Sequence, residues 1–185
     1  MLKKIMVLLI CGIIVCGLTG CGIIWFNDDK EKKSIDPAIS PRRYSSQILH
    51  DVENYLKYEN AEALCSLFSV YANVSTHKVQ GLLDFIDGEI VSIDNASIKS
   101  GGGKKRDGKY TYYAYNGRLI VKTDKEVKYQ VYFNGAAVFD EKPEKVGVSD
   151  ISFINFADSH DGYGVGFDFN EKGQQLDLDG NVVEW

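Results

Sequence analysis

The hydrophobic period of this 185-residue chain changes at Gly88, and that change constrains the fold more than any other feature. Between residues 41 and 87 apolar side chains recur every three or four positions, which is typical of amphipathic helices. From Glu89 onward apolar and polar residues alternate, which is typical of strands with one buried face. Helices followed by consecutive antiparallel strands predict an α+β fold, with the N-terminal helices packed on one face of the sheet.

Three helices are predicted before the change of period. Ser40 is the N-cap of the first, with Pro41 at its first position, while Asn60 and Ser75 are the expected caps of the second and third. Gly88 stands where a left-handed C-terminal cap of the third helix would lie. The apolar stripes of the three helices are, in order, Tyr44, Ile48, Leu49, Val52, Tyr55 and Leu56; Ala61, Leu64, Cys65, Leu67 and Phe68; and Val79, Leu82, Leu83 and Ile86.

The strands are predicted over residues 90–98, 110–122, 127–133 and 146–156. Gly101-Gly102-Gly103 is expected to open a loop after the first strand, and residues 123–126 are expected to form the turn between the second and third. Asn116-Gly117 suggests a β-bulge inside the second strand. Residues 174–179 and 182–185, which flank Gly180-Asn181, are predicted to form a small hairpin.

The N-terminal segment has the features of a bacterial lipoprotein signal peptide. Two lysines precede an apolar run from residue 5 to about residue 15, and Leu18-Thr19-Gly20-Cys21 then matches a lipobox. The pattern predicts cleavage before Cys21 and transfer of a diacylglyceryl group to its thiol, followed by further acylation with fatty acids such as palmitate. An uncleaved transmembrane anchor is the alternative, because apolar residues 23–26 continue the run. The run before Cys21 is shorter than the about 20 residues that a membrane span needs.

These features divide the chain into four parts. Residues 1–20 are assigned to the signal peptide, 21–42 to a lipidated flexible tether, 43–156 to an α+β domain and 157–185 to a Gly- and Asp-rich C-terminal extension. The tether is rich in charge and spans roughly 25 Å as a flexible coil of about 20 residues. The expected location is therefore the outer face of the cell membrane, with the lipid bilayer as a partner through acylated Cys21.

The charge balance argues against nucleic acid as a partner. The net charge is −5, and loss of Lys3 and Lys4 with the signal peptide makes it −7. An acidic surface repels phosphate backbones. Lys104-Lys105-Arg106 is the one basic cluster in the sequence, and beside Asp107 it is interpreted as a solvated turn.

The cysteines predict no intramolecular disulfide. Two of the four leave with the signal peptide and Cys21 is acylated, so Cys65 has no partner. Its apolar surroundings favour a small buried hydrophobic side chain over a nucleophile.

Three stretches together resemble a family of uncharacterised lipoproteins from Gram-positive bacteria. They are LDFIDGEIVS at residues 83–92, GKYTYYAY at residues 108–115, and VKTDK leading to YQVYF within residues 121–133, all set behind the lipobox. The resemblance covers roughly residues 43–156 and implies a nuclear-transport-factor-2-like, or cystatin-like, domain. Such a domain is a strongly curved antiparallel sheet around helices, with a conical cavity. The resemblance brings no catalytic residues.

The cavity implied by the resemblance would be lined by tyrosines. Alternation places Tyr110 and Tyr112 on one face of their strand and Tyr113 and Tyr115 on the other, and Tyr129 lies on the next strand. Phenol rings over an apolar floor are common in ligand sites. Tyrosine is also frequent in sheets on propensity alone, which is the alternative explanation for any single one of them.

Two functions are compatible with these patterns. The first is a non-catalytic module that binds a small molecule or an envelope protein. The second is a cavity enzyme, a hydrolase or isomerase, in which Asp84 or Asp87 acts as a base beside a tyrosine. Both acids also fit an ordinary helix-end surface. No trio of polar residues converges from separate elements, and His50 and His77 lack metal-ligand spacing, so the sequence favours binding without a metal or cofactor.

Overall fold

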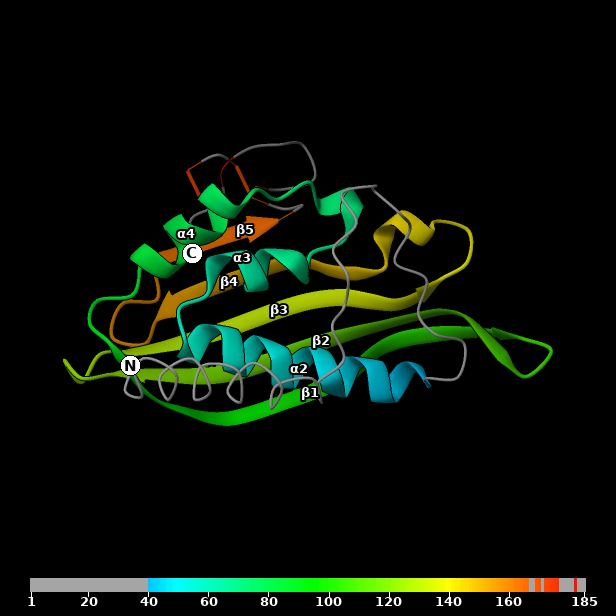
Figure 1. Cartoon of the computed structure of the whole chain (residues 1–185), viewed down its shortest axis with the longest axis horizontal. Coiled ribbons are helices and arrows are strands. Elements are labelled where there is room, and N and C mark those ends of the chain that lie inside the picture. Colours follow the sequence, from blue (N-terminus) through cyan, green and yellow to red (C-terminus); the bar gives the residue numbers. More distant parts are fainter. Residues whose placement is uncertain (1–39, 167–168, 171, 177–181, 183–185) are drawn as a thin grey trace, which may run out of the picture. The chain divides into compact units, whose positions relative to one another are not determined.

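The computed structural model describes residues 40–166, 169–170, 172–176 and 182, and in it the helices precede the strands as the hydrophobic period predicts (Figure 1). The predicted signal peptide, the lipobox with Cys21 and the predicted tether up to residue 39 lie outside the described residues. Across the described part of the chain, no helix has the length and hydropathy needed to span a membrane. The elements are α2 (Pro41–Lys57), α3 (Ala61–Ser66), η1 (Val70–Ala72), α4 (Thr76–Asp84), β1 (Ile90–Arg106), β2 (Lys109–Thr123), β3 (Lys128–Phe139), η2 (Pro143–Lys145), β4 (Gly147–Asn155) and β5 (Gly162–Gly166).

The three predicted N-caps are confirmed. The Ser40 hydroxyl accepts a hydrogen bond from the Arg43 amide at 3.3 Å, and the Asn60 side chain accepts one from the Ala63 amide at 2.9 Å. Ser75 caps α4 in the same way. Each cap satisfies an amide of the first turn that has no partner within the helix, which is why these helices begin where the sequence predicts.

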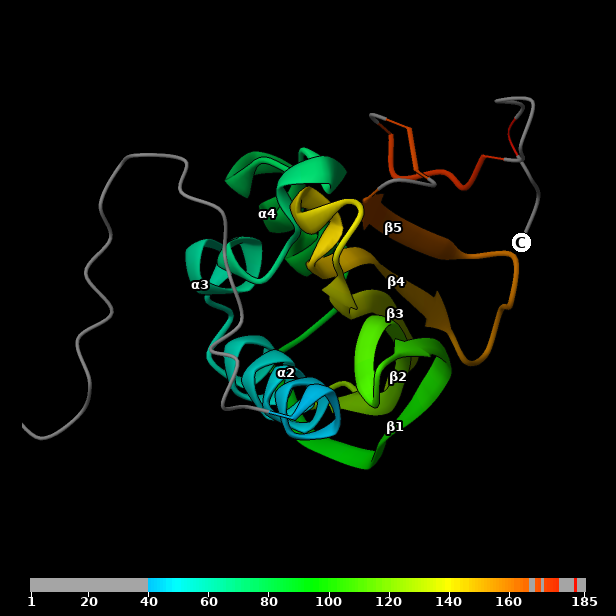
Figure 2. The same ribbon diagram turned by 90° about the vertical axis from the view of Figure 1, so that its right-hand side faces the viewer.

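The strands form one antiparallel sheet in the order β1-β2-β3-β4-β5, which confirms the α+β class. Figure 2 shows α2, α3 and α4 gathered on one side of this sheet. The predicted helix stripes face it. Their most deeply buried members, each at most 7% exposed, are Ile48, Val52, Leu56, Ala61, Leu64, Leu67, Phe68, Val79, Leu82 and Leu83. Alternate residues of β2 to β4 complete the core from the other side, among them Leu119, Val121, Val131, Phe133, Ile151 and Phe153.

The first strand is longer than predicted, because the three glycines do not end it. β1 continues through Gly101–Gly103 to Arg106 and pairs with β2 along this whole length. The register shifts between Ser100 and Gly102, where Gly102 has a φ of 128°. The glycines therefore form an irregularity inside a long hairpin rather than a separate loop, since a bulge absorbs the extra residue while pairing resumes beyond it.

The bulge predicted at Asn116-Gly117 is wrong. Both residues pair in continuous register with β1 and with β3. A Cβ on Gly117 would lie 1.9 Å from Cζ of Phe133, so the glycine makes room for that buried ring. The Asn116 amide donates at 2.5 Å to Asn134, whose own amide donates at 2.6 Å to the carboxylate of Asp150. Close packing and a side-chain ladder across three strands, rather than a change of register, explain this pair of residues.

Gly88 does not cap α4. The helix ends at Asp84 with Phe85 as its C-cap, and Gly88 lies further on in the connection to β1 with a φ of 98°. A Cβ at Gly88 would lie 2.4 Å from the Asp124 carboxylate, which itself accepts a hydrogen bond from the Glu89 amide. The positive φ is present as predicted, but it brings the chain against the β2–β3 turn instead of closing the helix.

The sheet extends into residues 157–185, which the sequence predicts to be a separate C-terminal extension. β5 pairs with β4, and the Gly164 amide donates to the Gly173 carbonyl at 2.8 Å. The ring of Phe169 packs where a side chain on Gly164 would otherwise lie. Of the predicted terminal hairpin, Leu176 and Val182 form an antiparallel bridge, and its remaining pairs lie outside the described residues.

Candidate functional site

Three of the five candidate tyrosines belong to the core of the domain. Tyr113, Tyr115 and Tyr129 are 8%, 0% and 2% exposed, whereas Tyr110 and Tyr112 are half-buried. The rings of Tyr110 and Tyr113 meet edge to face, with their centroids 5.1 Å apart. Tyr110 therefore groups with Tyr113, and the predicted pairing of Tyr110 with Tyr112 on one face does not describe these contacts.

A register shift near the start of β2 explains this grouping. Lys104 and Lys105 are consecutive in β1, but their partners in β2 are Tyr112 and Tyr110. β2 therefore has one extra residue, Thr111, between the two tyrosines. One extra residue reverses the alternation of side chains beyond it. The ring of Tyr112 instead packs edge to face on Phe139, at a centroid distance of 5.0 Å.

Tyr115 is the most enclosed of the five. Burial raises the pKa of its hydroxyl well above 10, and the nearby Tyr44 and Asp150 raise it further. Among the described residues the hydroxyl has no hydrogen-bond partner. Tyr44, on the first turns of α2, also has its pKa raised, to about 12, by burial and then by Asp51. These phenols stay neutral and pack the first turns of α2 against β2.

Tyr129 holds the connection between α4 and β1. Its hydroxyl accepts a hydrogen bond from the backbone amide of Asp87 at 2.9 Å. Its ring meets Phe85 and Phe153 edge to face, at centroid distances of 5.7 Å and 6.5 Å. A buried tyrosine with its hydroxyl bonded to a loop amide fixes the position of that loop.

The two acids of the enzyme hypothesis lie on the surface. The Asp84 carboxylate accepts a hydrogen bond from Gln80 at 2.8 Å, one helical turn earlier. The Asp87 carboxylate pairs with Lys125 at 2.5 Å and, mainly through this hydrogen bond, raises the pKa of the ammonium group. It is thus the backbone of Asp87, not its carboxylate, that contacts a candidate tyrosine.

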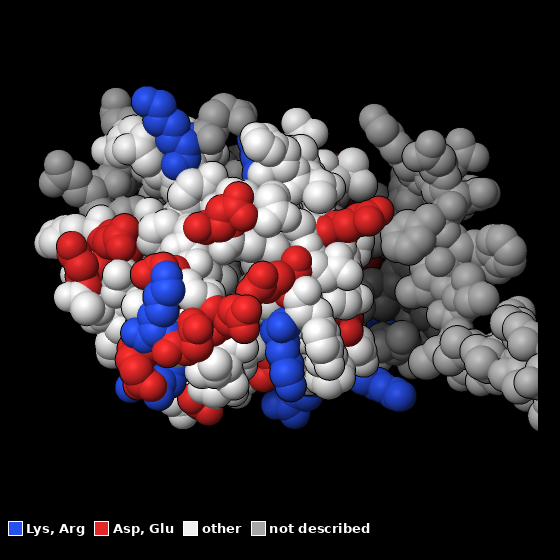
Figure 3. Space-filling view, turned by 60° about the vertical axis from the view of Figure 1, so that its left-hand side comes forward, with Lys and Arg blue, Asp and Glu red and all other residues white. Residues whose placement is uncertain are grey.

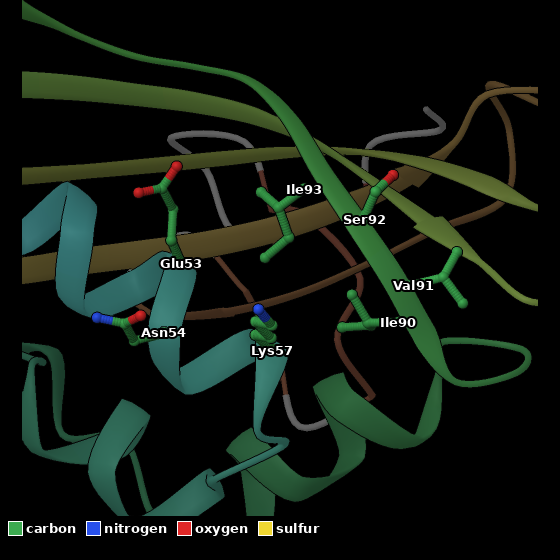
Figure 4. A pocket seen from close by; sticks show the side chains of 7 residues that line it. All are labelled: Glu53, Asn54, Lys57, Ile90, Val91, Ser92 and Ile93. Carbon is green, nitrogen blue, oxygen red and sulfur yellow. The ribbon is translucent and has the colours of Figure 1, made fainter.

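A pocket that the sequence did not indicate lies between α2 and the beginning of β1 (Figure 4). Its volume is about 170 Å³. One wall is polar and comes from the last turns of α2, with Glu53, Asn54 and Lys57. The other wall comes from β1, where Ile90, Val91 and Ile93 are apolar and Ser92 adds one hydroxyl.

The geometry of α2 brings opposite charges to this pocket. Glu53 and Lys57 are one helical turn apart, which places them on the same side of α2. The Glu53 carboxylate lies 4.0 Å from Nδ1 of His50. Among the described residues, no ion pair joins Glu53 to Lys57. The pocket can therefore offer an anionic and a cationic group above an apolar wall.

The described residues hold no cluster of three or more His, Cys, Asp or Glu side chains that would suit a metal ion. Cys65 is a free thiol, half-buried, and its Sγ lies 3.5 Å from the carbonyl oxygen of Val74. It belongs to the packing between α3 and the segment before α4.

Comparison with known proteins finds one family. Residues 51–156 match a domain of unknown function, DUF5104. No curated protein matches the chain. The matched residues run from within α2 to just beyond β4, and they include both walls of the pocket between α2 and β1. The match covers more than half of the chain, and the chain therefore belongs to the DUF5104 family.

Proposed function

We propose that the protein is a lipid-anchored extracytoplasmic binding module and that the pocket between α2 and β1 is its ligand site. The observation that carries this proposal is the pairing, in one pocket, of a polar wall from α2 with an apolar wall from β1. Ligand sites in general combine an apolar lining with a few placed polar groups that fix orientation. Anchoring rests on the lipobox and its cysteine, Cys21.

The fold proposed for this module is the nuclear-transport-factor-2-like cone. The supporting observations are three N-terminal helices followed by consecutive antiparallel strands, and several bulges in β1. Bulges increase the local twist of a strand, as a strongly curved sheet requires.

The size and charge of the pocket favour a small zwitterionic ligand. At about 170 Å³ the pocket is smaller than the roughly 300–1,000 Å³ of pockets that enclose drug-sized molecules. Glu53 suits an amino group and Lys57 a carboxylate, while Ile90 and Ile93 suit an aliphatic side chain. An apolar amino acid or a short peptide with an apolar residue combines these three features.

A thermal-shift screen with leucine and leucyl-leucine tests this site. We expect either compound to raise Tm, and Glu53→Gln or Lys57→Gln to reduce the shift. Glu62→Gln and Lys128→Gln are matched controls, because both are exposed positions outside the pocket. A shift that survives both pocket substitutions would move the ligand elsewhere on the domain.

Metabolic labelling with a fatty-acid analogue tests the anchor separately. The wild-type chain should be labelled, and Cys21→Ser should not, because the variant lacks the thiol that accepts the lipid. Equal label on both chains would contradict the lipoprotein assignment whatever the outcome at the pocket.

A further inference from the structure

The hairpin formed by the end of β1 and the start of β2 concentrates positive charge. Between Lys99 and Tyr110 the chain has five basic residues and a single acid, Asp107, although its net charge is −5. Every residue from 99 to 109 is exposed, and in Figure 1 this hairpin extends beyond the helices. Among the described residues no carboxylate forms an ion pair with these cations.

The first turn of α2 adds two more cations at the same end. Arg42 and Arg43 are exposed, and the turn contains no acid. Positive side chains at a helix N-terminus oppose the helix dipole, so helix stability does not explain them. Figures 1 and 2 both place the N-terminal end of α2 at the hairpin end of the domain. Tyr44 of this turn is close enough to Tyr115 to raise the pKa of its hydroxyl, in addition to the larger effect of burial. Tyr115 in turn pairs with Ser100 of β1, at the base of the hairpin.

The opposite end of the domain is acidic. The α4–β1 connection and the β2–β3 turn meet there, and they expose Asp84, Asp87, Glu89, Asp124 and Glu126. Figure 3 shows Asp and Glu side chains in a band across this end, with fewer Lys and Arg among them. Two of these carboxylates, on Asp87 and Glu126, form ion pairs with Lys125 and Lys122. The hairpin end therefore has an excess of cations and the opposite end an excess of carboxylates, although Asp140, Glu141 and Glu144 are exposed beside the base of the hairpin.

We propose that the basic end contacts the anionic headgroups of the membrane to which the protein is anchored. The basic end is defined by Arg42, Arg43, Lys99, Lys104, Lys105, Arg106 and Lys109. The inference rests on the proposed lipid anchor, and it adds a second contact with the bilayer through the folded domain. Basic side chains near an anionic lipid surface each strengthen its binding, and this attraction fades within a Debye length of about 8 Å at physiological salt.

The position of the anchor favours a membrane over a soluble anionic polymer. Twenty positions separate Cys21 from Pro41, where α2 begins. The tether predicted from the sequence would span roughly 25 Å if it is a flexible coil, and would keep the domain close to the bilayer at a high effective concentration. Because the tether joins the domain at its basic end, that end is the part held nearest to the lipid.

This orientation leaves the proposed ligand pocket accessible. The pocket lies where β1 begins, at residues 90–93, whereas the basic hairpin begins at Lys99 and reaches its tip beyond Arg106. With the basic end on the membrane, the pocket and the acidic end point toward the aqueous side. One bilayer contact through the acyl group and a second through the hairpin would set this orientation.

Binding of an unlipidated chain to vesicles tests the proposal. The chain is residues 21–185 with Cys21→Ser, which retains every described core residue, from Ile48 to Val165. Vesicles of phosphatidylcholine alone are compared with an equal mixture of phosphatidylcholine and phosphatidylglycerol. The chain should bind the anionic vesicles and release them as salt increases. The triple variant Lys104→Gln, Lys105→Gln, Arg106→Gln should bind about a hundredfold more weakly, at about fivefold for each charge.

A second triple variant provides the matched control. Lys78→Gln, Lys128→Gln and Lys172→Gln remove the same charge from positions away from the basic end, and binding should remain within about twofold of the unsubstituted chain. Equal binding to neutral and anionic vesicles, or equal losses in the two triple variants, would overturn the proposal. Hairpin-dependent binding to polyphosphate without binding to anionic vesicles would also overturn it, in favour of a polymer partner.

Failure of this test and failure of the anchor are distinguishable. The vesicle measurement uses a chain without the acylated thiol, so it does not depend on lipidation. Loss of vesicle binding with normal acyl labelling of the wild type would reject only the orientation. Hairpin-dependent binding to anionic vesicles without acyl labelling of the wild type would reject the lipid anchor, and it would leave only the affinity of the hairpin for anionic lipid.

Discussion

β2 passes through two regions of the domain that differ in almost every physical respect. Between Tyr113 and Thr123 every second residue is buried under the helices or the neighbouring strands. At Lys109, in the hairpin, the same strand is exposed and pairs with another cationic residue, Arg106. Packing restricts which residues the first region accepts, whereas almost nothing in the fold restricts the second. The charges of the hairpin are therefore better explained by what it contacts than by folding.

The largest effect is expected for truncation of a core side chain. Leu83 is 6% exposed and belongs to the α4 stripe that faces the sheet. Leu83→Ala should lower the free energy of unfolding by about 2–5 kcal/mol, because it removes buried methyl groups and leaves a cavity. Urea unfolding measures this loss. A midpoint equal to that of the wild type would mean that the stripe does not pack as described.

A pair of glycine substitutions compares the two regions directly. Gly117→Ala places a methyl group against the buried ring of Phe133 and should cost about 3 kcal/mol, near the upper end for overpacking. Gly108→Ala in the hairpin meets no atom within 4 Å, so its cost should be about 1 kcal/mol and come only from the φ of 78°. Thermal unfolding of the two variants provides the test. The reverse order would show that the hairpin is the more constrained region.

Local signals in the sequence predicted the parts of the fold that local physics determines. Ser40, Asn60 and Ser75 are caps because a side-chain oxygen can reach an amide three residues later within one turn. The stripes of α2 and α4 face the core because their spacing matches the helical period. The order of the strands likewise follows from short connections between antiparallel neighbours.

The features that the sequence did not predict depend on pairing between strands. The extra residue of β2 opposite Lys104 and Lys105 moves Tyr110 beside Tyr113, and nothing in the local pattern marks it. Gly117 was predicted to be a bulge, whereas its role is set by Phe133 on another strand.

The pocket was missed for a similar reason. The spacing of Glu53 and Lys57 in the sequence shows that they lie on the polar side of α2, but it is the same whether that side faces solvent or borders a groove. Only the path of β1 beside α2 distinguishes the two cases. A close pair of opposite charges near the C-terminus of a helix is too common to indicate a site by itself.

A smaller effect is expected from the buried phenols at alkaline pH. The pKa of Tyr44 is raised to about 12 and that of Tyr115 well above 10, so the unfolded chain loses these protons first as the pH rises. Stability is unaffected below the unfolded value of about 10 and falls as the pH increases above it. Tyr115→Phe should move the alkaline unfolding midpoint upward, with stability near pH 7 within about 1 kcal/mol of the wild type, because a hydroxyl without a partner is removed. Circular dichroism across a pH titration measures both quantities, and Tyr58→Phe, at an exposed tyrosine, is the control.

The smallest effect on stability is expected where we propose the largest effect on membrane binding. The triple variant Lys104→Gln, Lys105→Gln, Arg106→Gln changes exposed side chains that form no ion pair within the described residues. The ammonium group of Lys105 lies 4.4 Å from the centroid of the Tyr110 ring. A cation–π contact at an exposed lysine contributes little to stability. The free energy of unfolding should therefore change by no more than about 0.5 kcal/mol in urea. Relief of repulsion among neighbouring cations could make that change slightly favourable. A loss of several kcal/mol would instead show that the hairpin charges support the fold, and it would remove the contrast between the two regions of β2.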